Sequence, residues 1–484
     1  MPEHVLLWFR QDLRIEDNPA LAAAIGTGRP IIPVYIHAPD EELRWAPGGA
    51  SKWWLHHALE SLHQKLQEYG SGLVLRNGAS LENLLKICKS HQVTDVFWNR
   101  RYEPAIIGRD ADIKKQLRER GIGARSFSAS LLFEPHTIEN RSGKPFRVFT
   151  PFWKHLRTLH VEEPVAVDTG KLTAPHKRPR SESLEDLKLL PGIPWDKGFY
   201  QHWQPDLKTA GKALDEFVRQ RVSRYRDKRD LPAVNGTSRL SPYLHFGQLG
   251  PRQVWQSVLE AGPMDGPGEY TFLSEIGWRE FAYHLIFHFP ETPEQALNKA
   301  YSQFPWQPDD ENLKAWQTGQ TGYPIVDAGM RQLWQSGWMH NRVRMIAASF
   351  LVKHLLQPWQ EGARWFWDTL VDADLASNTM GWQWTAGCGA DASPYFRIFS
   401  PMLQGAKFDA DGEYIRTWVP ELKHMPAKYI HQPWEAPPDV LKKAGVDLGN
   451  NYPKPVVDHK AGRERALAAL AENKQRAASL KNSG

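Results

Sequence analysis

The chain has 484 residues, 41% of them hydrophobic and 24% charged, and a formal net charge of +5. This length allows two or three domains and a large apolar core, so neither disulfides nor a structural metal are needed for folding. The only two cysteines, Cys88 and Cys388, exclude a disulfide scaffold and a zinc-ribbon or iron–sulfur framework, and they fit a reducing, cytoplasmic compartment. No apolar run approaches the roughly 18 residues of a membrane span.

The first 130 residues alternate between strand-length apolar runs and helical stripes. Strands are expected at Val5–Phe9, Ile31–Ile36, Gly72–Arg76, Val93–Trp98 and Ala124–Phe127. Between them we expect one helix capped by Ser51, one opened by Ser80 and one over Asp110–Arg120. The alternation predicts an α/β domain with a Rossmann-like parallel sheet, although no G-x-G-x-x-G fingerprint follows the first strand.

Beyond residue 130 the strand signals fade. Residues 131–205 show no clear period and include the basic, proline-containing stretch Thr173–Ser183, so we expect an inter-domain linker there. Helices are expected at Ala210–Arg226, Pro251–Ala261, Glu269–Phe289, Pro324–Ser336, Asn341–Leu356, Gly362–Leu370 and His459–Leu480. The sequence therefore predicts an α/β domain over 1–130, a linker over 131–205 and an all-α domain over 206–484.

Tryptophan is unusually frequent, with 21 in the chain. Indoles fill cores, stack on flat ligands and carry electrons, and composition alone favours core packing. The small positive net charge permits a nucleic-acid partner without requiring one.

Two segments of the helical half carry polar residues that a core would not need. The run Gly236–Ser238 combines hydroxyls and backbone N–H groups next to Arg239, which suits phosphate binding, although a helix cap explains it equally well. Glu275 and Arg279 lie four apart on one helix face, where a surface ion pair is the default explanation.

A third segment, Trp338–Phe408, is denser in polar groups. Its two carboxylates at Asp372 and Asp374 suggest a metal ion or an acid pair. No histidine is near them and no calcium-loop spacing follows, so no metal site is expected.

Seven motifs in a fixed order carry a resemblance over nearly the whole chain. They are WFRQDLRIEDNPAL, GTSRLSPYLHFG, WREF, WMHNRVRM, DADLASN, GWQW and PYFRIF. Together they resemble the DNA photolyase and cryptochrome family, and most of all its bacterial members that repair cyclobutane pyrimidine dimers. The resemblance implies an N-terminal antenna domain and a helical domain that binds FAD and DNA.

The resemblance also implies which residues bind FAD. The pyrophosphate is expected at Tyr225, Thr237, Ser238, Arg239, Leu240 and Ser241, and the cavity lining at Phe272, Glu275, Arg279, Trp338, Asn341 and Arg344. Asp372 and Asp374 are expected at the ribose and flavin edge, and Asn378 against flavin N5. Arg344 would stabilise the anionic reduced flavin. Relatives often have tryptophan in place of Phe272, and plant cryptochromes typically have aspartate in place of Asn378, so the asparagine favours repair.

The implied activity is light-dependent repair of cyclobutane dimers by electron transfer from excited reduced FAD, a carbon–carbon lyase reaction. The lesion is expected to leave the duplex and enter a pocket, lined by Trp278, Trp384, Glu275, Asn341 and Met345. The branch that repairs (6-4) lesions has histidines in place of Asn341 and Met345, so their absence favours cyclobutane dimers. His340 is the nearest histidine, and we expect it on a different helix face.

Two further sets of residues follow from the same resemblance. Trp306, Trp359 and Trp382 match the family's electron-transfer chain, with core packing as the alternative explanation. The residues expected to contact DNA are Arg226, Trp278, Arg342, Trp384, Arg397 and Lys407. Scattered basic residues are otherwise ordinary solvated surface.

The alternatives concern function, antenna and partners. A cryptochrome-type photoreceptor uses the same FAD fold, although the short remainder after Pro453 argues against a long signalling tail, and the intact lesion-site residues argue against an inactive flavoprotein. A second chromophore is expected, either methenyltetrahydrofolate or 8-hydroxy-deazaflavin; the stretch WNRRYEPAIIGRD departs from one folate-contacting pattern without deciding between them. We expect a monomer that acts on UV-damaged DNA, without a membrane or an obligate protein partner.

Overall fold

A computed structural model describes residues 3–482 of the chain and divides it into two compact units. The first unit comprises the chain up to Arg226 together with Ser238–Pro290 and Val371–Ala376. The second comprises Asp227–Thr237, Glu291–Leu370 and the chain from Ser377 onward. No helix within residues 3–482 has the length and apolar character needed to cross a membrane.

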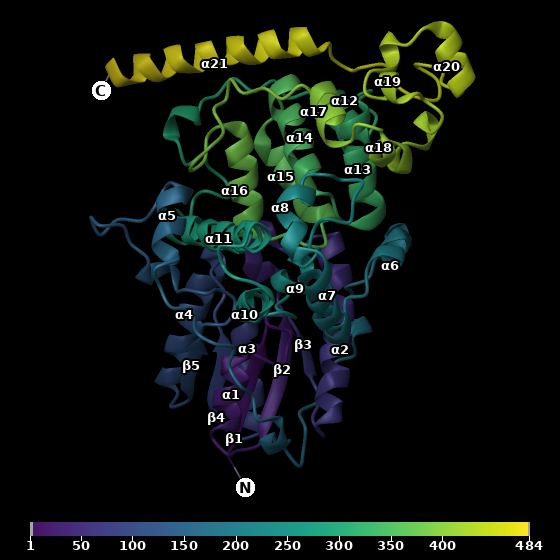
Figure 1. The fold of residues 1–484 in the computed structure, drawn as a ribbon. Coiled ribbons are helices and arrows are strands. Elements are labelled where there is room, and N and C mark those ends of the chain that lie inside the picture. The colour runs from purple at the N-terminus through teal and green to yellow at the C-terminus, as the bar shows by residue number, and fades with distance from the viewer. Residues whose placement is uncertain (1–2, 483–484) are drawn as a thin grey trace. The chain divides into compact units, whose positions relative to one another are not determined.

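The first unit is built on a five-stranded, fully parallel sheet in the order β3-β2-β1-β4-β5. Its strands are β1 (His4–Phe9), β2 (Ile31–His37), β3 (Val74–Asn77), β4 (Val93–Asn99) and β5 (Gly123–Phe127). The helices α1 (Pro19–Ile25), α2 (Gly49–Glu68), α3 (Ser80–Ser90) and α4 (Pro104–Glu119) surround the sheet (Figure 1). The predicted α/β fold is confirmed.

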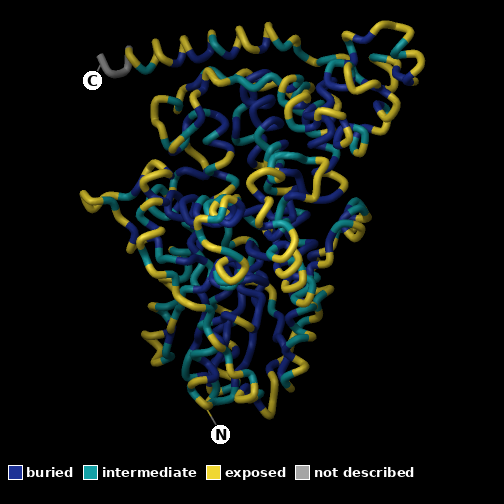
Figure 2. Tube along the Cα trace, viewed as in Figure 1, coloured by how far each residue is buried: buried dark blue, intermediate teal, exposed yellow. Residues whose placement is uncertain are grey.

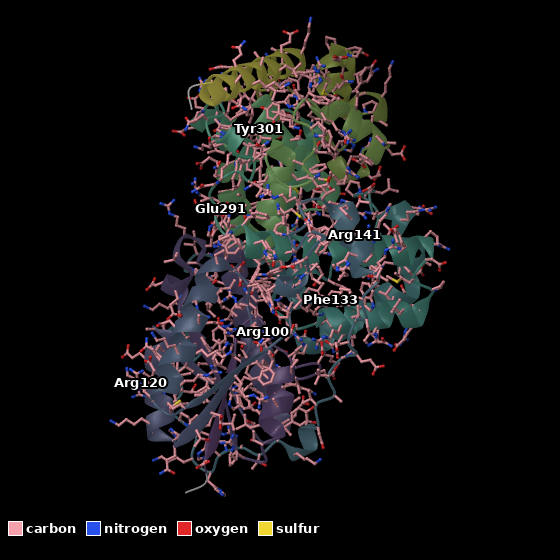
Figure 3. The ribbon with its side chains drawn as sticks, turned by 90° about the vertical axis from the view of Figure 1, so that its left-hand side faces the viewer. Arg100, Arg120, Phe133, Arg141, Glu291 and Tyr301 are labelled. Carbon is pink, nitrogen blue, oxygen red and sulfur yellow. The ribbon has the colours of Figure 1, made fainter. Side chains whose placement is uncertain are left out.

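The central strands owe their place to continuous apolar sequence. All seven residues of β2 are buried, as are five of the six in β1, and both strands are dark blue in Figure 2. A parallel sheet covered by helices needs such strands, because neither face meets water. Some charged side chains stay at the surface, such as Arg120 just after α4, which Figure 3 labels, whereas Arg14 and Asp17 are buried in the segment after β1.

Two local predictions for the first unit are wrong, and the segment predicted as a linker contains a helix. Helix α2 begins at Gly49, so Ser51 is a buried interior residue and not the cap. The predicted linker contains helix α5 (Phe149–Leu156), whose stripe of four buried apolar residues is too short to stand out as a period. The predicted helix over Ala210–Arg226 ends at Gln220, and a 3-10 turn, Val222–Arg224, separates it from a short helix.

Helices form the rest of the chain. Before residue 300 they are α6 (Phe199–His202), α7 (Leu207–Gln220), α8 (Tyr225–Lys228), α9 (Ser241–His245), α10 (Pro251–Ala261) and α11 (Pro267–His288). Then follow α12 (Asp310–Gln317), α13 (Pro324–Ser336), α14 (Asn341–Ser349), α15 (Trp359–Thr369), α16 (Leu375–Ala386), α17 (Pro401–Phe408), α18 (Glu413–Trp418), α19 (Ala427–Ile430), α20 (Pro438–Ala444) and α21 (His459–Asn482). The helix predicted over Asn341–Leu356 is α-helical only to Ser349 and continues as a π-helix, Phe350–His354.

Candidate functional site

The segment expected to hold phosphate has a strained backbone in the first unit. Arg239 has φ of 56°, a left-handed conformation that is uncommon outside glycine. Its guanidinium lies 4.4 Å from the centre of the Trp203 ring, and burial lowers the pKa of Arg239. The amide of Leu240 donates to Ser238 Oγ over 3.3 Å, which closes the turn before α9. A cation beside backbone held in such a turn suits an anionic ligand.

The two neighbouring carboxylates have different partners within this unit. Ser241 Oγ donates to Asp372 Oδ2 over 2.7 Å, so the start of α9 is tied to Asp372. Asp374 Oδ2 accepts a hydrogen bond from the Tyr283 hydroxyl and lies 3.6 Å from His245 Nδ1. Burial alone would raise the pKa of Asp374, but hydrogen bonding and charge from His245, the charge of Arg279 and the Tyr283 hydrogen bond together lower it below its ordinary value. Asp374 is therefore a buried, ionised anchor.

Helix α11 presents the expected cavity residues of the first unit as one stripe. Phe272, Glu275 and Arg279 follow at the spacing i, i+3, i+7, which puts them on one face. Phe272 is buried and meets the Tyr225 ring edge-on at 5.3 Å. Arg279 donates to the carbonyl of Ser130 over 2.6 Å. These contacts fix the aromatic and the cationic member of the stripe.

Trp278 lies beside that stripe and is half-buried. Its ring is stacked on Phe149, with the centroids 3.7 Å apart and the planes at 9°. Phe281 approaches the same indole edge-on at 5.9 Å. An aromatic side chain that is supported on one face and still partly exposed suits contact with a flat ligand.

In the second unit, α14 groups several of the expected residues. Arg344 donates from Nε to the carbonyl of Met339 over 2.8 Å, and its guanidinium lies 6.0 Å from the Trp338 ring. Asn341 is exposed and Met345 half-buried. The first two turns of α14 thus carry the amide of Asn341, the guanidinium of Arg344 and the thioether of Met345.

His340 stands before that helix as its N-cap, so it does not share a face with Asn341. Its Nδ1 accepts a hydrogen bond from the Arg342 amide over 3.2 Å. Burial lowers the pKa of His340 to about 4, so the ring is neutral at pH 7. A buried, neutral cap is a poor proton donor to a bound ligand.

The expected residues of α16 differ in exposure. Asn378 is half-buried and donates from Nδ2 to the carbonyl of Ala363 over 3.0 Å. Trp382 is buried and meets Trp316 and Phe366 edge-on, at 6.1 and 5.0 Å. Trp384 is half-buried.

The other two tryptophans of the expected chain also lie in the second unit. Trp359 is the first residue of α15 and is buried. Trp306 is half-buried, 4.4 Å from the Phe304 ring, and packs on an apolar cluster that includes Leu356 and Tyr395. Each of these indoles therefore packs against apolar neighbours. Such packing is compatible with the proposed role in electron transfer.

The basic residues expected to contact DNA are in different environments. Arg226 is exposed on α8 in the first unit. In the second, Arg342 and Lys407 both lie over the Phe408 ring, at 4.5 and 5.1 Å, and Arg342 also pairs with Asp230 at 2.9 Å. Arg397 is exposed. The structure thus brings Arg342 and Lys407 together, and it gives Arg342 a carboxylate partner that the motifs did not reveal.

Sequence reasoning missed three residues that support this site. His245 lies within the motif GTSRLSPYLHFG, and Tyr283 follows Arg279 by one helical turn; both hold Asp374. Phe149 lies in the predicted linker, where no pattern pointed to it. The first two had a usable signal in motif membership and i, i+4 spacing, whereas the third depends on a tertiary contact.

Comparison with known proteins places these residues in a family. Residues 5–169 match the model for DNA photolyase, and residues 272–472 match the FAD binding domain of DNA photolyase. The chain is 50% identical to the deoxyribodipyrimidine photo-lyase of Agrobacterium fabrum, over 97% of this chain and 98% of that protein. It is 42% identical to Cryptochrome-2 of Arabidopsis thaliana, over 98% of this chain and 80% of that one. The crystal structure of a bacterial class III photolyase from Agrobacterium tumefaciens matches with a TM-score of 0.93 at 50% identity, covering 98% of each chain. The chain belongs to the DNA photolyase and cryptochrome family.

Proposed function

We propose that the chain is a light-dependent deoxyribodipyrimidine photo-lyase that repairs cyclobutane pyrimidine dimers in DNA. Identity alone does not separate this from a photoreceptor role, because both a photo-lyase and a cryptochrome exceed 40% identity over nearly the whole chain. The observation that carries the proposal is Asn378. One of its two Nδ2 N–H groups donates to the Ala363 carbonyl, which leaves the other N–H and the amide oxygen for a ligand, and the side chain has no acid to exchange a proton.

The side chains present fit FAD. The hydroxyls of Ser238 and Ser241 and the guanidinium of Arg239 suit a pyrophosphate, and the aromatic pair Tyr225–Phe272 suits a flat ring system. When it is bound and reduced, FAD supplies the electron that light drives into the dimer. The proposed FAD-binding residues are Tyr225, Thr237, Ser238, Arg239, Leu240, Ser241, Phe272, Glu275, Arg279, Trp338, Asn341, Arg344, Asp372, Asp374 and Asn378.

The chain's own residues bind and orient the substrate. Trp278 and Trp384 offer apolar faces to the flipped bases, Glu275 and Asn341 hydrogen-bond their polar edges, and Met345 fills the remaining wall. Arg226, Arg342, Arg397 and Lys407 hold the flanking phosphates. Trp306, Trp359 and Trp382 would carry electrons toward the FAD-binding residues.

The same residues argue for cyclobutane dimers against (6-4) lesions. Opening a cyclobutane radical anion needs no added proton, whereas reversal of a (6-4) lesion needs proton transfer. Positions 341 and 345 hold no acid or base, and His340 is a buried, neutral helix cap. The two positions that hold histidines in the (6-4) branch therefore offer no proton donor here.

Two illuminated oligonucleotides of the same sequence test the substrate, one with a cyclobutane dimer and one with a (6-4) lesion. Chromatography should find the first restored and the second unchanged under blue light. Restoration of neither, by protein that carries reduced FAD, would favour the photoreceptor role. Restoration of the (6-4) lesion would refute the substrate assignment, and His340 would be the first residue to replace.

The FAD assignment has a test of its own. Asp372→Ala removes the partner of Ser241 and should lower the FAD content of the purified protein, while Asp368→Ala, an exposed carboxylate four residues earlier, should leave it unchanged. Equal FAD content in both variants would remove Asp372 from the site.

The proposed antenna and oligomeric state have their own tests. An absorption spectrum of the same samples would identify a folate or a deazaflavin antenna, and gel filtration with light scattering would test the proposed monomer. A cytoplasmic location is part of the same proposal.

A further inference from the structure

Helix α5 carries a residue in direct contact with the proposed lesion-binding indole. Phe149, its first residue, is buried and stacks on Trp278 with centroids 3.7 Å apart and planes at 9°. Trp153, one turn later, is nearly parallel to Phe149 at 6.3 Å and 8°. Both tryptophan rings are thus nearly parallel to Phe149, and of the three rings only that of Trp278 is half-buried.

Helix α11 packs closely against these rings of α5. A Cβ at Gly277 would lie 2.5 Å from Trp153 Cε3, so a larger residue there would push the α5 indole away. Phe281 meets both Phe149 and Trp278 edge-on, at 5.9 Å each. Gly277 and Phe281, which flank Trp278 on α11, therefore both contribute to the packing against α5.

The loop before α5 is fixed at several points. Figure 3 labels Phe133 and Arg141 on this loop. The amides of Leu132 and Phe133 donate to Glu280 Oε2, and the amide of Phe146 donates to His284 Nε2 over 3.0 Å. Glu280 and His284 are both on α11. The helix that carries Trp278 thus also sets the position of the segment that leads to Phe149.

From this geometry we propose that Phe149 is a positioning residue for lesion recognition, which holds the Trp278 indole in the orientation that stacks on the dimer. The inference rests on the proposed function. An unsupported tryptophan would sample several rotamers and lose that freedom on binding, whereas a stacked indole is already ordered. Phe149 covers one face of the ring, so the remaining exposed surface is the part that a flat ligand can meet.

The test is a double-mutant cycle on dimer discrimination. The full chain with bound FAD is titrated in the dark with an oligonucleotide that carries one cyclobutane dimer and with the undamaged oligonucleotide of the same sequence. Phe149→Leu should lower the ratio of the two dissociation constants about tenfold, the scale of a lost aromatic pair. In a Trp278→Ala background the same change should have no further effect. Phe149→Tyr, which keeps the ring, should retain the parent ratio.

A matched control separates positioning from general damage to α5. Phe152 is buried on the same helix and contacts Phe281 and His284. Phe152→Leu should lower the melting temperature and leave the ratio within about twofold of the parent. If Phe149→Leu does not fold, Phe149→Met removes the ring with a side chain that fills irregular space.

The outcomes separate the proposed function from the positioning role of Phe149. A parent without preference for the dimer overturns the proposed function and this inference with it. A discriminating parent whose ratio Phe149→Leu leaves unchanged overturns the positioning role alone. So does an equal loss in Phe152→Leu, or the same additional loss in the Trp278→Ala background.

Discussion

Trp278 in the first unit and Trp382 in the second have opposite surroundings, although both lie on helices within family motifs. Trp278 is half-buried and lies face to face with one aromatic neighbour. Trp382 is buried and meets two aromatic rings only by their edges. Exposed surface suits the proposed ligand-binding role of Trp278, and a buried, fixed setting suits the proposed electron-carrying role of Trp382. The local packing thus distinguishes these two tryptophans, which the residue type alone does not.

The clearest test of this difference is Trp382→Phe. Phenylalanine keeps the edge-on packing but does not carry the positive charge, so photoreduction of oxidised FAD should fall to background. Dimer binding and repair by FAD that is already reduced should remain near the parent level, because Trp382 is not among the residues proposed to contact the lesion. Flash absorption spectroscopy measures the first and chromatography of repaired oligonucleotide the second. Loss of dimer binding in Trp382→Phe would erase the distinction from Trp278.

The buried setting of Trp382 depends on a glycine. A Cβ at Gly362 would overlap the six-membered ring of Trp382, whereas a Cβ at Gly381, directly before that tryptophan, would meet nothing within 4 Å. Gly362→Ala should destabilise the protein by roughly 3 kcal/mol, at the upper end of overpacking costs, and should slow photoreduction. Gly381→Ala should instead stabilise helix α16 by about 1 kcal/mol. Thermal melts of both variants check this, and similar melting temperatures would contradict the tight fit around Trp382.

The sequence predicts the architecture better than the contacts that support individual side chains. Continuous apolar runs and helical stripes were enough for the sheet and most helices, because burial alone sets those patterns. The eight-residue helix α5 was missed, and with it Phe149, because its role comes from a contact with Trp278 more than a hundred positions away. Likewise, nothing in the motif WMHNRVRM reveals that His340 is a helix cap or that Arg342 pairs with Asp230. Such contacts depend on tertiary packing that no local pattern encodes.

The support of Trp278 is also expected to depend on pH through Glu280. Burial raises the pKa of Glu280 to about 7, from 4.5. Between these values the folded chain keeps a proton that the unfolded chain has released, so stability falls as pH rises from about 4.5 to 7. Glu280→Gln keeps an acceptor for the amides of Leu132 and Phe133 without the ionisation. It should therefore raise the free energy of unfolding at pH 8 by about 2 kcal/mol, as 1.36 kcal/mol per pKa unit implies after relaxation, and by little at pH 5.

Denaturant titrations at pH 5 and pH 8 measure this difference. Glu260→Gln, an exposed carboxylate on α10, serves as the control and should have no effect at either pH. A variant at Glu280 that is equally stable relative to the parent at both pH values would show that the loop before α5 is not held by a titrating group.

The smallest expected effect applies the same contrast between exposed and enclosed side chains to DNA binding. Arg397 is exposed, whereas Arg342 is half-buried and pairs with Asp230 at 2.9 Å. Each phosphate contact that is lost should flatten the dependence of log affinity on log salt by about 0.9. Arg397→Ala should show this full change. Arg342→Ala should show less than half of it, because Asp230 already offsets part of the charge that Arg342 brings to the DNA.

Asp230→Ala should act in the opposite direction. It releases Arg342, so it should tighten DNA binding and steepen the salt dependence. Titrations of one dimer-containing oligonucleotide at several salt concentrations compare the three variants. Equal slopes for Arg342→Ala and Arg397→Ala would mean that the ion pair opens on binding at no net cost, and an unchanged slope for both would remove the two arginines from the DNA interface.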